Sequence, residues 1–257
     1  MLFLLSPAKR LDYETPLPPG LPHTLPRFAG PAAELIAELR GKTPAQIARL
    51  MKLTDQLAAL NVARYAAWRR QATEGHARQA LFAFDGTVYG GLDARTLTPA
   101  ELDWAQQRLV ILSGLYGALR PLDWMQPYRL EMGAKLPTAR GADLYQFWGE
   151  RIAAELNARL AGEQTPTVVN LASREYFQAV RREALKARVI ECVFEDYRDG
   201  RYKVIGLRAK RARGLMARYA VQHKLISPDR LKDFALEGYA FDMAASEPER
   251  LVFRRKG

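Results

Sequence analysis

Three short apolar segments, each ending in polar residues, constrain the fold more than any other feature of the sequence. They are MLFLL at residues 1–5, RLVILSG at 108–114 and TVVNLAS at 167–173. Continuous apolar runs of this length are typical of strands that are buried on both faces of a sheet. Because helical patterns separate the three segments, we expect strands alternating with helices in an α/β or mixed α+β fold.

The rest of the chain adds helices and a late hairpin. TPAQ at Thr43 and TPAE at Thr98 combine an N-cap, a proline at the first helical position and a Gln or Glu three residues on, so helices begin near Pro44 and Pro99. Further helices are expected over 31–40, 55–70 and 143–161, from Ala209 and, as a short helix, after Ser227. Strands are expected over 79–84 and 251–255, with a flexible loop over 85–92. A hairpin is expected from the strands 188–197 and 201–207 around the turn 198–200.

Size and charge limit the function classes. The chain has 257 residues with 48% hydrophobic content, which is enough for a substantial core. No repeat, low-complexity linker or break in composition divides it, so we expect one domain over 1–257, with a mixed central sheet and flanking helices. The net charge of +11 favours polyanionic partners, whether nucleic acid, anionic membrane or phosphorylated metabolites, over a merely basic protein, because the charge is locally concentrated.

The densest concentration of charge lies between residues 201 and 228, which contain eight Lys or Arg and no Asp or Glu. Such a run is a solvated helix face, a disordered tail or an anion-binding surface. Apolar residues recur at Ala212, Leu215, Met216 and Tyr219, at spacings that build one helix face, and this regularity excludes the disordered tail. The helix carries Lys210 and Arg213 on one flank and Arg211 and Arg218 on the other, so one flank can line a cleft while the other faces solvent.

Polar residues also follow the predicted buried strands, where ligand sites of α/β folds gather. Ser6 and Lys9 follow the first strand, and Asn170, Ser173 and Tyr176 belong to the end of the third. The second strand leads into the loop 113–133, which contains Tyr116, Arg120, Asp123, Tyr128, Arg129 and Glu131. That loop is either a structural loop with an Arg–Asp pair or part of a site. Three strand ends bearing such groups predict an anion-binding cleft.

Several familiar chemistries lack their motifs. The chain has no GxxxxGK[ST], no GxGxxG that opens a helix and no GxSxG. The three histidines are isolated and Cys192, on a predicted strand face, has no spaced partner, so we expect a packed thiol, no metal site and no cofactor. The apolar run at the N-terminus is too short for a signal peptide, and no segment reaches membrane-spanning length. We therefore expect a soluble, cytoplasmic protein without a membrane partner.

Several motifs together resemble the YaaA family of peroxide stress resistance proteins. They are SPAK (Ser6–Lys9), SGLYGALRPLD (Ser113–Asp123), QPYRLEMG (Gln126–Gly133), LYQFWG (Leu144–Gly149), NLAS-EY (Asn170–Tyr176), KRARGLMAR (Lys210–Arg218) and EGYAFD (Glu237–Asp242), and the similarity is collinear from residue 1 to about 255. The resemblance implies a bacterial cytoplasmic protein of the hydrogen peroxide response with a family-specific α/β fold. It also implies binding of duplex or branched DNA through a positive cleft and protection from iron-driven DNA damage.

The resemblance further implies a helix-hairpin-helix element, which we place in the helix pair 44–70. Such hairpins bind phosphate through backbone N–H groups next to glycines. In LAALNVAR this chain has Ala59 and Asn61 where glycines are expected, although Arg64, Arg69 and Arg70 still supply charge. The departure puts a phosphate contact of this pair in doubt.

The leading hypothesis is a sequence-nonspecific DNA-binding protein of oxidative stress defence. Its expected phosphate contacts are Lys9, Arg120, Arg129, Lys210, Arg211, Arg213 and Arg218, with Ser6, Tyr128, Asn170 and Tyr176 as polar groups of the cleft. The alternative is an enzyme acting on a nucleotide or nucleic-acid base, with Asp123, Glu131, Tyr116 and Ser173 as candidate catalytic residues. Direct iron binding is a third interpretation, which the scattered histidines and single cysteine disfavour. No feature of the sequence indicates a protein partner.

Overall fold

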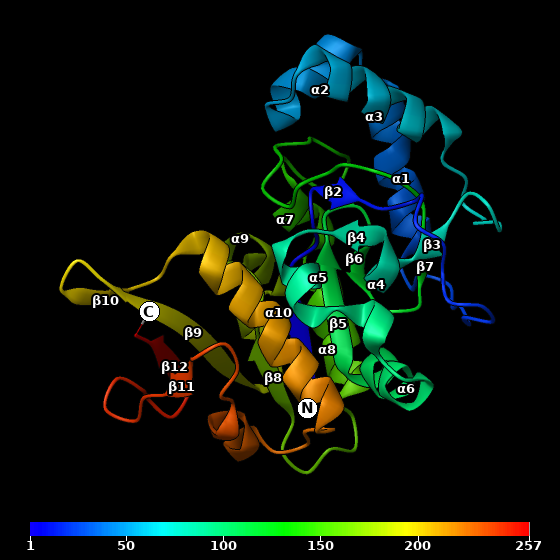
Figure 1. Cartoon of the computed structure of the whole chain (residues 1–257). Helices are drawn as coiled ribbons and strands as arrows, with labels where there is room; N and C mark the ends of the chain where they lie inside the picture. Colours follow the sequence, from blue (N-terminus) through cyan, green and yellow to red (C-terminus); the bar gives the residue numbers. More distant parts are fainter. Residues whose placement is uncertain (257) are drawn as a thin grey trace.

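Twelve strands and ten α-helices make up the computed structural model, which describes residues 1–256 (Figure 1). The strands are β1 (Leu2–Leu5), β2 (Arg10–Leu11), β3 (Arg78–Gln79), β4 (Phe84–Asp85), β5 (Leu109–Ser113), β6 (Gly117–Leu119), β7 (Trp124–Met125), β8 (Thr167–Asn170), β9 (Arg188–Arg198), β10 (Arg201–Lys203), β11 (Ala240–Phe241) and β12 (Arg250–Arg255). The helices are α1 (Ala29–Arg40), α2 (Pro44–Met51), α3 (Asp55–Ala67), α4 (Ala80–Ala83), α5 (Thr87–Leu92), α6 (Pro99–Arg108), α7 (Leu144–Trp148), α8 (Arg151–Arg159), α9 (Arg174–Phe177) and α10 (Gly206–Gln222).

The central sheet has the order β11-β12-β9-β8-β1-β5-β6, with β10 paired to β9. Strands β12, β9, β8, β1 and β5 are parallel neighbours, whereas β11, β10 and β6 pair antiparallel. The three predicted buried strands β8, β1 and β5 lie side by side at the centre, where Phe3 pairs with both Leu109 and Val169. The predicted α/β class with a mixed central sheet, flanking helices and a late hairpin is therefore confirmed.

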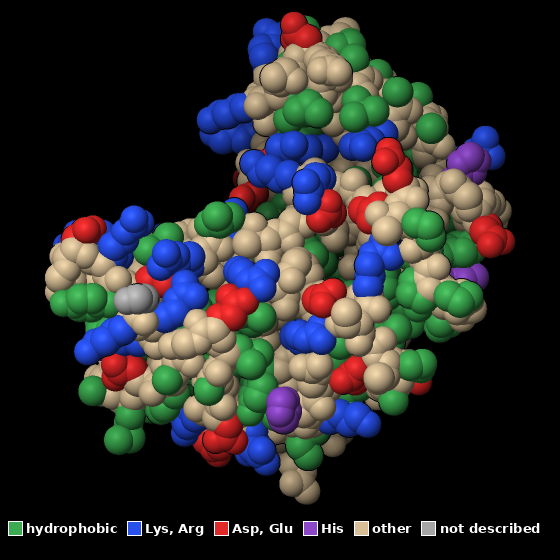
Figure 2. All heavy atoms as spheres, in the orientation of Figure 1, with side chains coloured by type: hydrophobic (Ala, Val, Ile, Leu, Met, Phe, Trp, Pro, Cys, Tyr) green, Lys and Arg blue, Asp and Glu red, His purple; other side chains and the backbone are tan. Residues whose placement is uncertain are grey.

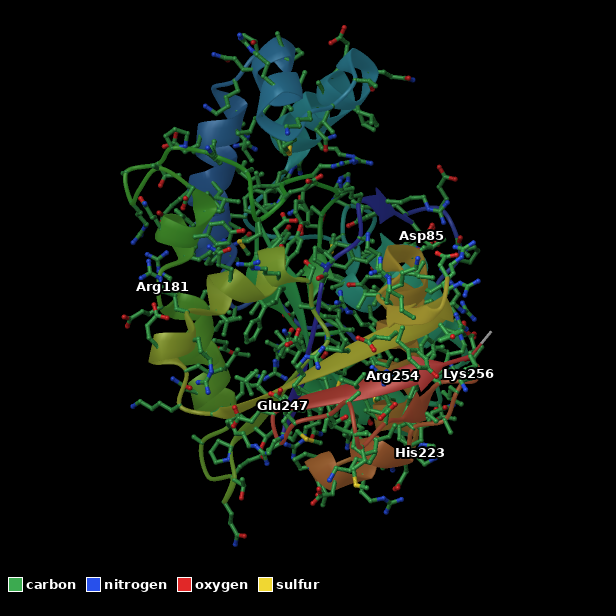
Figure 3. The ribbon with its side chains drawn as sticks, turned by 90° about the vertical axis from the view of Figure 1, so that its left-hand side faces the viewer. Asp85, Arg181, His223, Glu247, Arg254 and Lys256 are labelled. Carbon is green, nitrogen blue, oxygen red and sulfur yellow. The ribbon has the colours of Figure 1, made fainter. Side chains whose placement is uncertain are left out.

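Helices cover both faces of this sheet. In Figure 1 α10 and α5 lie in front of it, and Figure 3, turned by 90°, shows α10 on one side of β9 and β12 and α8 and α9 on the other. The helices α2 and α3 lie beyond one end of the sheet (Figure 1). Both predicted capping boxes are present, at Thr43 and Thr98, and each places its proline at the start of a helix. No helix within residues 1–256 combines the length and apolar character that crossing a bilayer requires.

The segment 79–92 differs from prediction. The expected strand over 79–84 is wrong, because residues 80–83 form the single helical turn α4 between two two-residue strands. The expected flexible loop over 85–92 is the helix α5. Its Gly91 and Gly214 of α10 allow the two helices to pack backbone to backbone: a Cβ added at Gly214 would lie 1.9 Å from the Val88 carbonyl oxygen, and one at Gly91 would lie 2.4 Å from that of Arg211. These glycines serve close packing and not flexibility.

Two helix boundaries also differ. The helix expected over 143–161 is divided into α7 and α8 at Gly149, whose φ of +50° lies in the left-handed region that interrupts a helix. The basic helix begins at Gly206 and not at Ala209, so Arg208 belongs to its first turn, and the second hairpin strand ends at Lys203 instead of residue 207. The hairpin itself is confirmed, with Asp199 and Gly200 both at positive φ in its turn. Cys192 is buried on β9, and burial raises the pKa of its thiol to about 12, which confirms a packed thiol.

Candidate functional site

A cavity of about 810 Å³ lies where the chain leaves β1 and β8. The carboxyl ends of parallel strands are where α/β folds place their ligand sites. The walls come from five segments: residues 6–10, 85–90, 128–131, 171–176 and one flank of α10. The charged lining residues are Lys9, Arg10, Arg129, Lys210 and Arg213, together with Asp85, Glu131 and Glu175. The cavity therefore joins strand ends that are far apart in the sequence to the basic helix.

Hydrogen bonds tie the loops after β1 and β8 together. The Ser6 hydroxyl oxygen accepts a hydrogen bond from the Ser173 N–H at 2.8 Å, and the two serine hydroxyl oxygens lie 3.4 Å apart. The Tyr89 hydroxyl of α5 donates to the Ser6 carbonyl at 3.0 Å. Both serines line the cavity. The Ser6 hydroxyl is held by the Ser173 backbone N–H, and the Ser173 hydroxyl lies next to it.

Glu131 forms the centre of one wall. Its Oε1 lies 3.2 Å from Lys9 Nζ and 2.7 Å from Arg129 Nη2. The Tyr65 hydroxyl of α3 donates to the Arg129 carbonyl, which fixes the backbone beneath this pair. Two cations share one carboxylate, so the wall keeps a net positive charge. Lys9 is 70% exposed, whereas Arg129 is only 16% exposed.

The α10 wall carries Lys210 and Arg213, three residues apart and therefore on one face of the helix. Neither side chain forms an ion pair or a hydrogen bond with residues 1–256. Burial lowers the pKa of Arg213, while the charge of Glu191 opposes that shift. A partly dehydrated guanidinium without a close counterion favours an incoming anion, because the anion restores the interactions that water no longer supplies.

Two buried phenols lie at the cavity. Tyr128 lines it, and its hydroxyl oxygen is hydrogen-bonded to that of Ser113 at 2.6 Å; Tyr176 lines it from α9. Burial raises the pKa of both hydroxyls above the ordinary tyrosine value. Both phenols therefore remain protonated at neutral pH and can donate hydrogen bonds.

Some predicted site residues lie outside the cavity and support the loop 113–133. Asp123 is 1% exposed and accepts hydrogen bonds from the Thr24 hydroxyl at 2.6 Å and the Arg120 N–H at 2.8 Å, and it pairs with the Arg120 guanidinium at 3.2 Å. Burial raises the pKa of Asp123, although these hydrogen bonds oppose the shift. Tyr116 is buried and accepts from Trp68 Nε1 at 2.8 Å, and the Asn170 side chain accepts from the Ala172 N–H. The structural role of the Arg–Asp pair, one of the two interpretations from sequence, is present here.

The second flank of α10 faces away from the cavity. Arg211 is paired with Glu237 at 2.6 Å. Arg218 donates to the carbonyls of Leu92 and Asp93, at 2.9 and 3.0 Å, and so supplies partners for the end of α5. Both arginines connect α10 to neighbouring segments, whereas Lys210 and Arg213 do not.

The helix pair forms differently from the arrangement expected on resemblance. The turn between α2 and α3 is at residues 52–54, and Lys52 adopts the left-handed conformation there. Ala59 and Asn61 lie within α3, where the buried Asn61 side chain donates to the Leu57 carbonyl. LAALNVAR is therefore not a hairpin turn, and the placement of glycine-like positions there is wrong, because helical N–H groups are already bonded within the helix.

Arg10, Asp85 and Glu175 all line the cavity, but no motif in the sequence marks them as site residues. Arg10 Nε pairs with Asp85 Oδ2 at 2.6 Å, and Glu175 accepts from the Gly133 N–H at 3.0 Å. Arg10 directly follows SPAK, but Asp85 belongs to a segment that resembled a flexible loop. Within residues 1–256, no group of three or more His, Cys, Asp or Glu side chains is arranged to hold a metal ion.

Comparison with known proteins shows one family over nearly the whole chain. Residues 1–245 match the family described as "Peroxide stress protein YaaA". The chain is 65% identical to a UPF0246 protein of Paracidovorax citrulli over 256 residues, which cover 100% of this chain and 99% of that protein. It is 63% identical to a UPF0246 protein of Variovorax paradoxus over 259 residues and 62% identical to one of Verminephrobacter eiseniae over 256, with coverage of 100% of this chain and 99% and 98% of those proteins.

Proposed function

The chain belongs to the family of the peroxide stress protein YaaA, and from that membership and the cavity described above we propose that it binds duplex or branched DNA through the phosphate backbone. In this function the protein limits oxidative, iron-driven damage to DNA during hydrogen peroxide stress. It acts in the bacterial cytoplasm, where the chromosome lies. DNA is the partner, and the contacts require neither a membrane nor a cofactor.

The observation that carries the proposal is the arrangement of cations around one hollowed face. Figure 2 shows this face indented between the α2–α3 part of the molecule and the part that carries the β9–β10 hairpin, with Lys and Arg side chains on both sides of the indentation. The cavity contributes five cations against three carboxylates. Charges placed along a concave surface attract a polyanion and release its counterions, which is the sequence-independent part of DNA binding.

Not all cations serve equally in this proposal. Lys9, Arg129, Lys210 and Arg213 line the cavity. In this proposal Lys210 and Arg213, which have no carboxylate partner, make the main phosphate contacts, and Lys9 and Arg129, which share Glu131, add to them from the opposite wall. Arg120, Arg211 and Arg218 are engaged by Asp123, Glu237 and the end of α5, so a phosphate contact would compete with an existing interaction. We therefore expect these three to contribute less to affinity.

The enzymatic alternative receives less support from the geometry. Of the four candidate catalytic residues, Glu131 and Ser173 line the cavity, whereas Asp123 and Tyr116 are occupied in buried hydrogen bonds. Within residues 1–256 the hydroxyls of Ser6 and Ser173 are hydrogen-bonded to no basic side chain. Activation of a serine nucleophile requires such a base, so binding fits this lining better than acyl or phosphoryl transfer.

The test measures duplex affinity as a function of salt concentration. We expect log K to fall linearly with log salt, with a slope near −0.9 for each phosphate neutralised. The double substitution Lys210→Ala/Arg213→Ala is expected to reduce the size of that slope by about 1.8 and to weaken binding. Arg211→Ala/Arg218→Ala removes the same charge from the same helix and serves as the matched control. Unchanged slope and affinity in the first variant would contradict the proposal for this surface.

A cellular test addresses the stress function. A deletion strain that carries the Lys210→Ala/Arg213→Ala variant is expected to survive hydrogen peroxide less well and to accumulate more DNA strand breaks than one carrying the wild-type chain. Equal protein levels in the two strains are the control. If the variant protects fully while its duplex affinity is lost, peroxide resistance does not depend on DNA binding.

A further inference from the structure

We propose that the cavity accommodates a single nucleotide unit, with its phosphate at Lys210 and Arg213 and its base against Tyr128 and Tyr176. The inference rests on the proposed function for the case in which the nucleotide is turned out of bound DNA. A free mononucleotide carries the same phosphate and base and would bind the same residues. Fluorescence of a labelled duplex and binding of dAMP distinguish the two sources.

The size of the cavity sets the first limit. Its volume of about 810 Å³ falls in the range of roughly 300–1,000 Å³ that is typical of sites for small ligands. A cavity of this volume is too small to hold a duplex, whose major groove alone is about 12 Å wide. Neutralising the backbone of a duplex needs only surface charge. A cavity of this volume at the same place is therefore unexplained by backbone binding alone.

The charge distribution within the cavity indicates which wall the phosphate of the nucleotide faces. Lys210 and Arg213, on one flank of α10, are the cations of the lining that have no carboxylate partner within residues 1–256, whereas Lys9, Arg10 and Arg129 are all paired. An ammonium and a guanidinium side by side are the groups that bind phosphate, the guanidinium with two parallel hydrogen bonds. The phosphate group therefore belongs at the α10 wall.

The opposite part of the lining suits a base. Tyr128, Tyr176, Leu130 and Leu171 provide ring and aliphatic surface against which a base can pack. Glu131 accepts hydrogen bonds from Lys9 and Arg129 and, as a carboxylate with further lone pairs, can accept from an exocyclic amine. The hydroxyls of Ser6 and Ser173 donate or accept at the same end. Apolar walls with a few fixed polar groups are how proteins bind a nucleotide turned out of the stack.

The experiment uses the full chain and two probes. The first is a duplex with one central 2-aminopurine opposite an abasic site, whose fluorescence rises when the base leaves the stack; the second is dAMP, with deoxyadenosine as the phosphate-free comparison. We expect saturating protein to raise the fluorescence, and dAMP to bind about tenfold or more tightly than deoxyadenosine. Lys210→Ala/Arg213→Ala is expected to abolish both differences, and Arg211→Ala/Arg218→Ala to preserve them. Lys210→Glu, at an exposed position, tests the same wall should the double variant fold poorly.

Each outcome has a distinct meaning. A fluorescence rise that depends on Lys210 and Arg213 supports a nucleotide turned out of the duplex. Phosphate-dependent binding of dAMP without a fluorescence rise supports the same pocket with a free nucleotide as its ligand. Tight duplex binding with no fluorescence change and no dAMP binding overturns the inference but leaves DNA binding in place. Binding of dAMP without duplex affinity rejects the proposed function and keeps the pocket, and binding of neither probe rejects both.

Discussion

The cations on the two flanks of α10 stand in opposite situations. Arg211 and Arg218 bond to Glu237 and to the end of α5, so they connect the helix to the rest of the molecule. Lys210 and Arg213 line the cavity and form no ion pair with residues 1–256. A run of positive charge in a sequence is thus not one functional unit. Charge that is already paired supports the fold, and charge that is held without a partner is available to a ligand.

The positions of both flanks depend on how closely α10 packs against α5, and Gly214 is the residue that permits this packing. An alanine there would bring its Cβ to 1.9 Å from the Val88 carbonyl oxygen, so the helices must separate. We expect Gly214→Ala to lower the free energy of unfolding by about 3 kcal/mol or more, measured by denaturant titration. It would also move both flanks and weaken duplex binding.

Gly206→Ala is the matched control on the same helix. A Cβ at Gly206 would meet nothing within 4 Å. We expect unchanged stability or a gain of up to about 1 kcal/mol, because alanine favours a helix more than glycine. Equal effects at Gly206 and Gly214 would show that helix propensity and not close packing governs the contact.

Asp196 pairs with Arg208 in the first turn of α10, on the flank that also carries Arg211 and Arg218. Its carboxylate pairs with Arg208 at 3.0 Å and with Arg255 at 2.6 Å, and it accepts from the Tyr239 hydroxyl at 2.8 Å. Burial raises the pKa of Asp196, but these hydrogen bonds outweigh it and the net pKa is lowered. We expect Asp196→Asn to cost about 2 kcal/mol of unfolding free energy at pH 7, because it leaves Arg255 without its counterion.

The same substitution has a pH test. A carboxylate whose pKa is lower in the folded state stabilises the fold above its unfolded pKa, and this contribution is lost as the pH falls through the folded pKa. The difference between wild type and Asp196→Asn is therefore expected to shrink from pH 7 toward pH 3 in denaturant titrations. A difference that stays constant over this interval would mean that shape and not charge accounts for the loss.

The buried strands and helix caps could be predicted because their determinants are local. MLFLL, LVILS and TVVN are apolar without interruption, and Thr43 and Thr98 carry complete capping signals next to their helices. The helix α5 could not be predicted, because Gly90 and Gly91 resemble a loop until Gly91 is known to pack against the backbone of Arg211 and Leu215 in α10. Close backbone contact between segments more than a hundred residues apart leaves no local pattern.

The candidate site shows the same division. The strand ends at Ser6 and Ser173 were expected to meet, and their spatial proximity follows from the parallel pairing of β1 and β8. The fate of individual cations was not predictable, because Arg120 and Lys9 look alike in sequence, yet one is paired with a buried aspartate outside the cavity and the other lies at its wall. Which carboxylate a cation meets is decided by the tertiary fold.

Paired substitutions on the two flanks compare stability with binding directly. We expect Arg211→Ala/Arg218→Ala to lower the free energy of unfolding by about 1–2 kcal/mol, through loss of the Glu237 pair and the bonds to α5. Lys210→Ala/Arg213→Ala is expected to change it by no more than about 0.5 kcal/mol, since neither side chain has a partner to lose. Unfolding free energy and duplex affinity should be measured on the same preparations. The Arg211/Arg218 variant should mainly lose stability, and the Lys210/Arg213 variant should mainly lose affinity. Equal changes in both quantities for both variants would remove the distinction between the flanks.

The smallest expected effect is the pH dependence of the unfolding free energy that comes from the Arg211–Glu237 pair. The hydrogen bond from Arg211 lowers the pKa of Glu237, so this pair stabilises the fold above the unfolded pKa of a glutamate and ceases to do so as the pH falls through the folded pKa. Because the Glu237 side chain is 36% exposed, solvent screening limits the contribution to at most about 1 kcal/mol. The stability difference between wild type and Glu237→Gln should therefore be present at pH 6 and should decline once the pH falls below the unfolded pKa of a glutamate. Lys210→Ala, on the flank without a carboxylate partner, should give a difference that does not vary over this range, and a matching pH dependence there would reveal a carboxylate acting on the flank that we assign to the ligand.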